Sequence, residues 1–257
     1  MSNHAVQAKS YSNQQLRQYT LKMMKKHHLR GSIEIVKNGH AQRVSLGYGY
    51  YSKRLKNGNT KLLYPVGSLQ KMVTAAIITQ LIYQKKFNQN TKISRWYPNL
   101  KHANQITVGQ LMTHTSGINV IGTESNHGVN FSENGAINWT IAQANARENT
   151  GRSKFNYNNA NYVLLAGIIS KVTGKSYAAN VKQRVIRSLK LKQTDIYQQI
   201  PRSKTDAISY LYSGGKNYSA SAYANRNVVS QLPGAGNLFS TANDYYKIQS
   251  GMQNGKI

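Results

Sequence analysis

Ser68 and Lys71 have the types and the spacing that acyl-transfer chemistry needs. Three residues are just under one helical turn, so the two side chains would share one face of a helix. Pro65 and Gly67 precede them and an apolar run follows from Met72, which places the serine near the N-terminus of a buried helix, where free N–H groups favour negative charge. Burial disfavours a charged lysine, which could then serve as proton partner of a nucleophilic hydroxyl. Ser-x-x-Lys alone is common in lysine-rich chains and establishes nothing.

Four longer blocks of sequence add to this pair. They are YPVGSLQKMVTAAIITQLI from residue 64, ITVGQLMTHTSGI from 106, FNYNNANYVLLAGIISKVTGKSY from 155 and LPGAGNLFSTANDYYKI from 232. In this order they resemble the serine hydrolases of the penicillin-binding protein and class C β-lactamase superfamily, which includes D-alanyl-D-alanine carboxypeptidases and related esterases. The resemblance extends over nearly the whole chain.

The resemblance implies a role for each matching residue. Ser68 is expected to be the acylated nucleophile and Lys71 its proton partner. Tyr157 is expected to be the general base for acylation and the acid toward the leaving group. Asn159 is expected to bind substrate, through a hydrogen bond to the substrate's amide side chain, and to contact the lysine. No cofactor and no metal ion are expected.

Other candidates have a structural interpretation. His114 invites a Ser–His reading, but in the matching block His-Thr-Ser-Gly ends a helix, which we expect Gly117 to close. Ser116 is a poor nucleophile candidate for the same reason. Asp244 is expected near the start of a helix rather than as a catalytic acid, and the seven histidines show no metal-ligand spacing.

The charge balance points to an anionic partner. The chain has 34 Lys plus Arg against 7 Asp plus Glu, a formal net charge of +27. A field of one sign concentrates anionic partners, and both nucleic acid and the teichoic-acid-rich wall of a Gram-positive bacterium qualify. The basic residues are scattered without an Arg-rich arm, so no nucleic-acid partner is expected. With no cysteine, disulfides and cysteine nucleophiles are excluded.

The pattern of elements predicts an α+β fold, with an antiparallel sheet flanked by helices and a mostly helical lobe. We expect a first helix at 14–28, a hairpin at 32–51 turning at Asn38-Gly39, a third strand at 62–66 and a buried helix at 68–86. Further helices are expected at 107–115, 136–148, 159–173, 177–188 and from Thr241, which could cap the last one. No strand is evident between these helices.

Residues 1–257 are expected to form a single β-lactamase-like domain. Its sheet part would comprise 12–88 and 230–257, and its helical lobe would span about 90–190. The superfamily's third motif, Lys-Thr-Gly or His-x-Gly on an inner strand, should follow the block at 232–248 and does not occur before Ile257. We therefore expect the closing strands to be missing, as in a C-terminally truncated domain.

These observations predict a serine hydrolase that acts through an acyl-enzyme on D-alanyl peptides or D-alanyl esters of the cell envelope. One alternative is a non-catalytic or weakly active relative that binds a wall polyanion, and another is a β-lactamase or small-ester esterase. The expected partners are peptidoglycan or a teichoic-acid-type wall polymer and a small acyl substrate. We expect a location at the cell surface of a Gram-positive bacterium, with no transmembrane segment in this chain and with the signal or anchor outside it.

Overall fold

The computed structural model describes residues 11–147, 150–152 and 154–257. Its contacts cluster into two compact units. The first comprises the chain up to Leu62 together with Ile208–Ala222, and the second comprises Leu63–Ala207 and Tyr223–Ile257. The single-domain organisation expected from the sequence stays a prediction.

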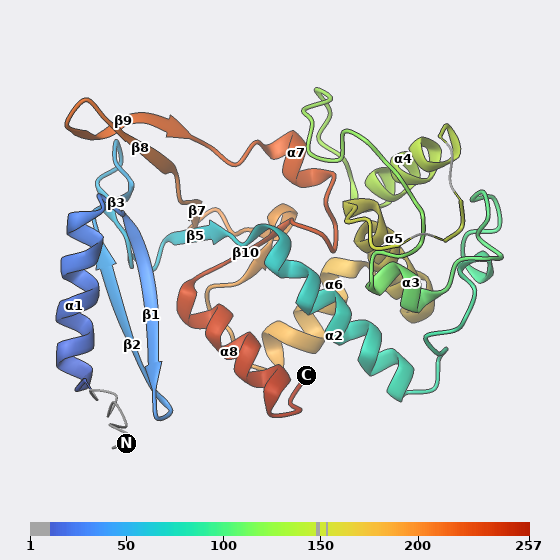
Figure 1. The fold of residues 1–257 in the computed structure, drawn as a ribbon, viewed down its shortest axis with the longest axis horizontal. Helices are drawn as coiled ribbons and strands as arrows, with labels where there is room; N and C mark the ends of the chain where they lie inside the picture. Colours follow the sequence, from blue (N-terminus) through green and yellow to red (C-terminus); the bar gives the residue numbers. More distant parts are fainter. Residues whose placement is uncertain (1–10, 148–149, 153) are drawn as a thin grey trace, which may run out of the picture. The chain divides into compact units, whose positions relative to one another are not determined.

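The first unit opens with helix α1 (Asn13–Lys26). Ser12 caps it in a reciprocal capping box with Gln15, which satisfies two N–H groups that a helix start leaves unpaired. Strands β1 (Gly31–Lys37) and β2 (His40–Leu46) form the predicted antiparallel hairpin, and α1 packs against β2 (Figure 1). Asn38 and Gly39 both have positive φ, as a tight hairpin turn requires.

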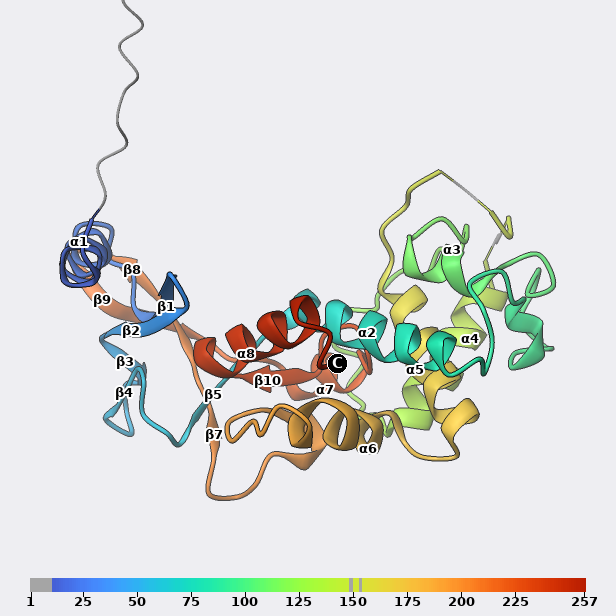
Figure 2. The same ribbon diagram turned by 90° about the horizontal axis from the view of Figure 1, so that it is seen from below.

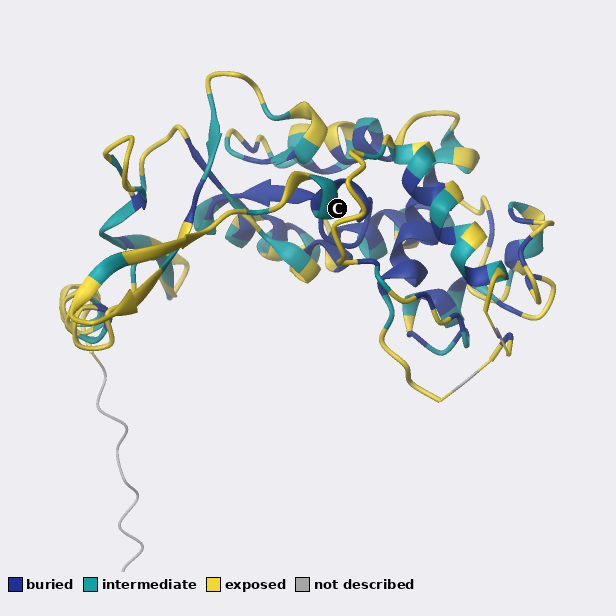
Figure 3. Ribbon diagram, turned by 90° about the horizontal axis from the view of Figure 1, so that it is seen from above, coloured by how far each residue is buried: buried dark blue, intermediate teal, exposed yellow. Residues whose placement is uncertain are grey.

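Two further strand pairs complete the first unit. Strand β3 (Tyr48–Tyr50) pairs with β4 (Leu55–Lys56), and β8 (Ser209–Ser213) pairs with β9 (Lys216–Ala222). The sequence did not indicate β8 and β9, because most of their residues are exposed and show no apolar alternation. The exposed hairpin is mostly yellow in Figure 3.

A four-stranded sheet provides the frame of the second unit. Its order is β6 (Asp195–Ile196), β10 (Leu238–Ser240), β5 (Leu62–Pro65) and β7 (Thr205–Asp206). Strand β10 lies antiparallel to both β5 and β6. The expectation of no strand between the helices was therefore wrong, since β6, β7 and β10 lie between α6 and α8. Each has only two or three residues, too few to show a period.

The predicted helices of the second unit lie close to their expected positions. They are α2 (Gln70–Tyr83), α3 (Val108–Met112), α4 (Glu133–Asn145), α5 (Asn159–Thr173), α6 (Tyr177–Val181) and α8 (Ala242–Gln253). The short helix α7 (Arg226–Ser230) was not predicted. A 3-10 turn, Gly67–Leu69, leads into α2, and a π-helical turn, Lys182–Arg187, continues α6. In the described ranges no helix combines the length and apolar character needed to cross a bilayer.

Helix α5 is the centre of the second unit. Every residue from Asn159 to Ile169 is buried, and α5 contacts α2, α3, α4 and α6 (Figures 1 and 2). Helix α2 is buried through Val73, Ile77, Ile78 and Leu81. The first turns of α2 and α5 are thus held in one apolar core, which fixes the polar side chains at their starts.

Candidate active site

Ser68 lies in the 3-10 turn that leads into α2, after Gly67 with a φ of +54°. The serine side chain is exposed to solvent. Its Oγ lies 2.6 Å from the hydroxyl oxygen of Tyr157 and accepts a hydrogen bond of 3.0 Å from Lys71 Nζ. N–H groups at a helix start lack intrahelical acceptors and favour negative charge. The serine expected to be the nucleophile therefore has a phenol hydroxyl and an amine within hydrogen-bond distance.

Lys71 is buried in the first turn of α2, with 7% of its surface exposed. Its Nζ donates to Ser68 Oγ, to Asn159 Oδ1 at 2.8 Å and to the backbone oxygen of Ala235 at 3.0 Å. Burial lowers the pKa of Lys71, whereas the hydrogen bond and charge of Tyr157 and the charge of Glu124 oppose that shift. An ammonium group has three donors, and all three have an acceptor here.

The hydrogen bonds of Lys71 determine where the serine proton points. When Lys71 is an ammonium, Ser68 Oγ accepts from it, so the serine's own hydrogen is left for Tyr157. The Lys71 Nζ also lies 4.9 Å from the centroid of the Tyr157 ring. A cation at this position stabilises negative charge on the phenol oxygen. Tyr157 is therefore placed to receive the proton of Ser68.

Tyr157 and Asn159 are delivered together by the start of α5. Asn158 caps this helix by accepting from the N–H of Ala160. The residues on either side of the cap take opposite environments, because Tyr157 is 47% exposed whereas Asn159 is 6% exposed. The structure thus brings all four sequence-predicted residues, Ser68, Lys71, Tyr157 and Asn159, into one hydrogen-bonded group.

His114 holds the segment that carries Tyr157. Its backbone oxygen accepts from Asn156 N–H at 2.8 Å, and its ring Nδ1 lies 3.3 Å from the N–H of Asn158. The ring lies against that of Tyr157, with 4.5 Å between centroids. Burial, and then the charge of Lys71, lowers the pKa of His114, which favours the neutral ring that can accept. This agrees with the structural role expected from the sequence.

The end of α3 differs from the expectation in one respect. Gly117 was expected to close this helix, but the left-handed residue after it is His114, with a φ of +57°. Thr115 N–H then bonds back to the oxygen of Gln110, as in a Schellman motif. Gly117 makes a later turn, also with positive φ. Ser116 is buried and donates to Asn161 Oδ1, so it holds the fold rather than facing solvent as a nucleophile must.

The segment 232–240 supplies an acceptor that no side-chain motif could reveal. Ala235 offers only its backbone oxygen to Lys71, and Gly234 offers its oxygen to Thr74 Oγ1 at 2.7 Å. The buried Gln70 fixes this segment to α2 by donating to Asn237 Oδ1 and accepting from the N–H of Leu238, each at 2.8 Å. The backbone carbonyl that accepts from Lys71 is therefore held in place by a buried polar network.

Glu124 is a further member of the group that sequence reasoning missed. Its Oε1 accepts from Asn159 Nδ2 at 2.7 Å. It lies in a polar loop between α3 and α4, where spacing gives no signal for a carboxylate of the site. Within the described ranges no three His, Asp or Glu side chains come together as a metal site requires.

Asp244 has the structural role expected from the sequence. Thr241 caps α8 by accepting from the N–H of Asp244 at 3.3 Å. The buried carboxylate accepts from the N–H groups of Lys192 and Gln193 at 3.0 and 2.7 Å. It thereby ties the loop before β6 to the start of α8.

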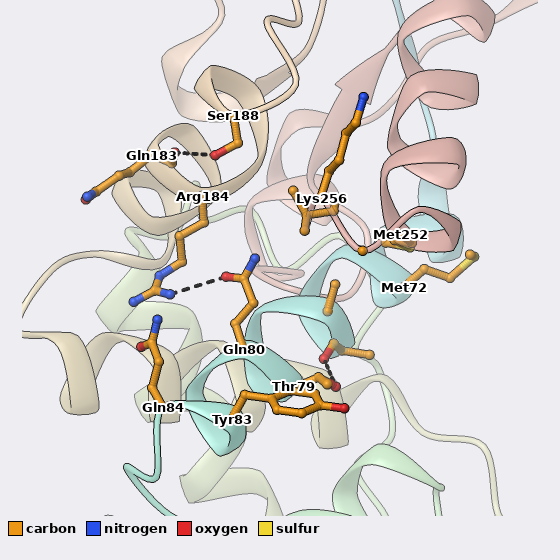
Figure 4. Close-up of a pocket in the computed structure, with 14 residues that line it drawn as sticks. Met72, Thr79, Gln80, Tyr83, Gln84, Gln183, Arg184, Ser188, Met252 and Lys256 are labelled. Atoms are coloured by element: carbon orange, nitrogen blue, oxygen red, sulfur yellow. Dashed lines mark hydrogen bonds between the residues drawn. The ribbon is translucent and has the colours of Figure 1, made fainter.

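A pocket of about 1040 Å³ lies on another face of α2. It is lined by Met72 and Tyr83 of α2, Arg184 of the π-helical turn and Met252 of α8, among others (Figure 4). Arg184 donates to Gln80 Oε1 at 3.2 Å across it. None of Ser68, Lys71, Tyr157 or Asn159 lines this pocket, so its size gives it no part in the chemistry.

Most of the chain matches a known protein family. The Beta-lactamase family model matches residues 16–255. The teichoic acid D-alanine hydrolase of Staphylococcus aureus is 32% identical over 229 residues, which make up 88% of this chain and 55% of that protein. The chain therefore spans about half the length of the curated relatives it matches.

Solved structures show the same fold. The crystal structure of FmtA from Staphylococcus aureus matches with a TM-score of 0.81 and 28% identity, over 97% of this chain and 68% of that one. A D-amino acid amidase from Ochrobactrum anthropi matches with a TM-score of 0.77 and 20% identity, over 94% and 72%. The fold class expected from the sequence is confirmed.

Proposed function

Because this chain belongs to the beta-lactamase family, we propose that it is a serine acyl hydrolase that forms an acyl-enzyme at Ser68. The substrates we propose are D-alanyl peptides or D-alanyl esters of the bacterial cell envelope. The observation that carries the proposal is the Ser68 hydroxyl, which lies 2.6 Å from the hydroxyl of Tyr157 and 3.0 Å from Lys71 Nζ. A nucleophile with a base in hydrogen-bond reach, and a third group on that base, is the arrangement that covalent catalysis requires.

In the proposed reaction, Ser68 Oγ bonds to the acyl carbonyl carbon while its proton passes to the phenolate of Tyr157. The carbonyl electrons move onto the oxygen and return as the bond to the leaving alcohol or amine breaks. Tyr157 gives its proton to that leaving group. Water then attacks the ester on Ser68, Tyr157 takes a proton from the water, and Ser68 Oγ recovers it as the acid leaves.

Lys71 acts in this scheme through its charge. An ammonium held between Ser68, Asn159 and Ala235 stabilises negative charge on Tyr157 Oη and on the attacking oxygen. The lysine loses no proton in either step. Asn159 accepts a hydrogen bond from the ammonium and so keeps it in place, which makes it a positioning residue in this scheme.

The proposed substrate class rests on the relatives and on charge. The relative from Staphylococcus aureus is a teichoic acid D-alanine hydrolase, and this chain carries a net charge of +27. A strongly positive protein is concentrated on anionic wall polymers. We therefore propose a teichoic-acid-type polymer as the partner and the bacterial cell surface as the location. The same charge also favours a second candidate, a wall-binding relative with little activity.

Covalent labelling separates these two candidates. The protein would be treated with a fluorophosphonate and, in parallel, with a fluorescent penicillin, and the adduct located by mass spectrometry. An enzyme gives an adduct on the peptide that contains Ser68, lost in Ser68→Ala and retained in the matched variant Ser116→Ala. An adduct elsewhere, or labelling that survives Ser68→Ala, would exclude the proposed nucleophile. Absence of any adduct together with retention on wall polymer would favour the binding protein.

A further inference from the structure

The carboxylate of Glu124 is connected to the catalytic lysine through a single side-chain amide, that of Asn159. Its Oε1 accepts from Asn159 Nδ2 at 2.7 Å, while the other end of the same amide, Oδ1, accepts from Lys71 at 2.8 Å. Lys71 in turn donates to Ser68 Oγ. The charge of Glu124 also acts on Lys71, whose ammonium it stabilises. A negative group is thus joined to Lys71 and Ser68 through the side-chain amide of Asn159.

A carboxylate at this place is unusual for this protein, which has 7 acidic residues in all. Other acids have structural partners. Glu133 accepts from the N–H groups of Tyr177 and Ala178, and Glu34 pairs with Arg43. Glu124 is exposed, and in the part of the chain that the structure describes no lysine or arginine lies within 4.0 Å of its oxygens. Its outer face is therefore open to a cation from solution.

The loop that carries Glu124 is held at both sides of it. On one side Asn158 Nδ2 donates to the oxygen of Val120 at 2.9 Å. On the other side Gln231 Nε2 donates to the oxygen of Ser125 at 2.6 Å. The neighbouring Thr123 is 8% exposed. The carboxylate is thus presented by a fixed segment, as a recognition group needs to be.

These contacts occupy both the N–H donors and the oxygen of the Asn159 side-chain amide. A side-chain amide has two N–H donors, and here Nδ2 donates to Glu124 Oε1 at 2.7 Å and to Thr123 Oγ1 at 3.3 Å. Its oxygen is taken by Lys71. An N-acylated substrate would require an N–H donor for its amide oxygen, and Asn159 has none to offer. A substrate with a free amine instead offers donors, for which Glu124 is the acceptor.

We propose that Glu124 binds the free α-ammonium of an aminoacyl substrate and so selects D-alanyl esters over N-acylated D-alanyl peptides. This proposal rests on the proposed acyl-enzyme function and chooses between its two substrate classes. The α-nitrogen is bonded to the carbon next to the carbonyl that Ser68 attacks, so it must lie close to the catalytic group. There it meets the cation of Lys71 and the positive field of the whole protein. A charge-assisted bond to Glu124 offsets that repulsion.

The test compares three esters with one leaving alcohol: D-alanyl, D-lactyl and N-acetyl-D-alanyl. The D-lactyl ester replaces the ammonium by a hydroxyl of similar size. The variant is Glu124→Gln, which keeps an oxygen acceptor for Asn159 and removes only the charge. Glu34→Gln, which removes one negative charge from the β1–β2 hairpin, is the matched control. The kcat/KM of each ester is measured by release of the alcohol.

We expect Glu124→Gln to lower kcat/KM for the D-alanyl ester by about 10- to 100-fold, the usual range for a hydrogen bond to a charged group. At the plateau of the pH profile the D-lactyl and N-acetyl esters should lose much less, because they offer no ammonium to Glu124, and Glu34→Gln should leave all three unchanged. Equal loss on all three esters, or no loss, would overturn the role of Glu124 while Ser68-dependent hydrolysis of the D-lactyl ester upheld the proposed function. If Ser68→Ala leaves the hydrolysis of every ester unchanged, the proposed function fails and the inference fails with it.

Discussion

The hydroxyl oxygens of Ser68 and Tyr157 lie 2.6 Å apart, although 89 residues separate them in the chain. Three segments of the second unit make this possible: the start of α2, the start of α5 and the segment 232–240. Lys71 contacts all three, through Ser68, Asn159 and Ala235. Groups joined in this way act as one unit, so the loss of Lys71 should affect Tyr157, and the loss of Tyr157 should affect Lys71.

Lys71→Ala and Tyr157→Phe should each lower turnover by about 10²–10⁴-fold, because the first removes the charge that stabilises Tyr157 and the second removes the group that accepts the proton. The double variant should lose little more than the worse single variant, because residues that act together fail together. Ester hydrolysis under saturating substrate measures this. Tyr83→Phe, at an 84% exposed position on α2, is the matched control and should retain full activity. Losses that multiply in the double variant would show that the two groups act independently.

Glu124→Gln should also move the pH profile. Burial lowers the pKa of Lys71, and the negative charge of Glu124 opposes that shift by stabilising the ammonium. Without this charge the pKa of Lys71 falls further. The limb of kcat/KM that reports Lys71 should therefore move to lower pH, measured on the uncharged D-lactyl ester so that the substrate itself does not titrate. A limb that stays in place or moves to higher pH in Glu124→Gln would contradict the electrostatic link. Glu34→Gln is the control and should leave the limb in place.

The four candidate catalytic residues could be predicted from the sequence because they lie within short motifs. Ser68 and Lys71 share one helical turn, and Tyr157 and Asn159 flank one helix cap, so each pair is fixed by local structure. Glu124 and Ala235 reach the site only through contacts between segments distant in the chain, such as Gln231 with Ser125. Ala235 contributes a backbone oxygen, which no residue type can signal.

The elements were predictable where burial is one-sided or complete over a long run. Helix α5 was expected at 159–173 and lies at Asn159–Thr173, because a long buried run bounded by Asn158 and Gly174 has clear ends. Strand β10 has three buried residues, and a run this short has no period to read. Strands β8 and β9 are exposed on much of both faces and lack the alternation that a half-buried strand shows.

His114→Asn should make stability less dependent on pH. The pKa of His114 is lowered in the folded protein, first by burial and then by the charge of Lys71. A histidine in the unfolded chain has a pKa of about 6.5. Below that pH the unfolded chain binds the proton more readily, so the stability that the neutral ring contributes is lost as pH falls through this window. Asparagine tolerates the left-handed conformation at this position.

Urea unfolding at several pH values tests this prediction. The free energy of unfolding of His114→Asn, relative to the unsubstituted protein, should rise as the pH falls from about 7.5 to about 5.5. A difference that stays constant with pH would show that the ring of His114 does not titrate differently in the two states.

The positive charge should make binding to wall polymer sensitive to salt. With a net charge of +27, attraction to an anionic polymer falls as the Debye length shortens from about 10 Å at 0.1 M to about 3 Å at 1 M ionic strength. Retention on teichoic acid, or on intact Gram-positive wall, should therefore fall steeply between these salt concentrations. A wall stripped of its anionic polymer is the control. Retention that is equal at both salt concentrations would show that charge is not what binds.

Gly234→Ala should lower both stability and turnover. Gly234 precedes Ala235, whose backbone oxygen accepts from Lys71, and there is no room for a side chain at this position. Gly234 has a φ of +77°, and an added Cβ would lie 2.7 Å from the oxygen of Tyr162 and 2.8 Å from Cβ of Ala166, both on α5. A left-handed alanine costs about 1–2 kcal/mol, and overpacking a core costs about 1–3 kcal/mol more. Relief of the clash would move the oxygens of Gly234 and Ala235 away from Thr74 and Lys71.

Gly174→Ala separates these two costs. Gly174 caps α5 with a φ of +67°, and an added Cβ would meet nothing within 4 Å, so this control carries the left-handed strain without the clash. It should lose about 1–2 kcal/mol of unfolding free energy and keep its turnover. Gly234→Ala should lose more stability and, in the folded protein, up to about 10²-fold in turnover, as a small displacement of a catalytic group can cause. If the two variants behave alike in urea unfolding and in ester hydrolysis, then the segment 232–240 can shift without moving Lys71, and the carbonyl of Ala235 does not hold the lysine in its catalytic position.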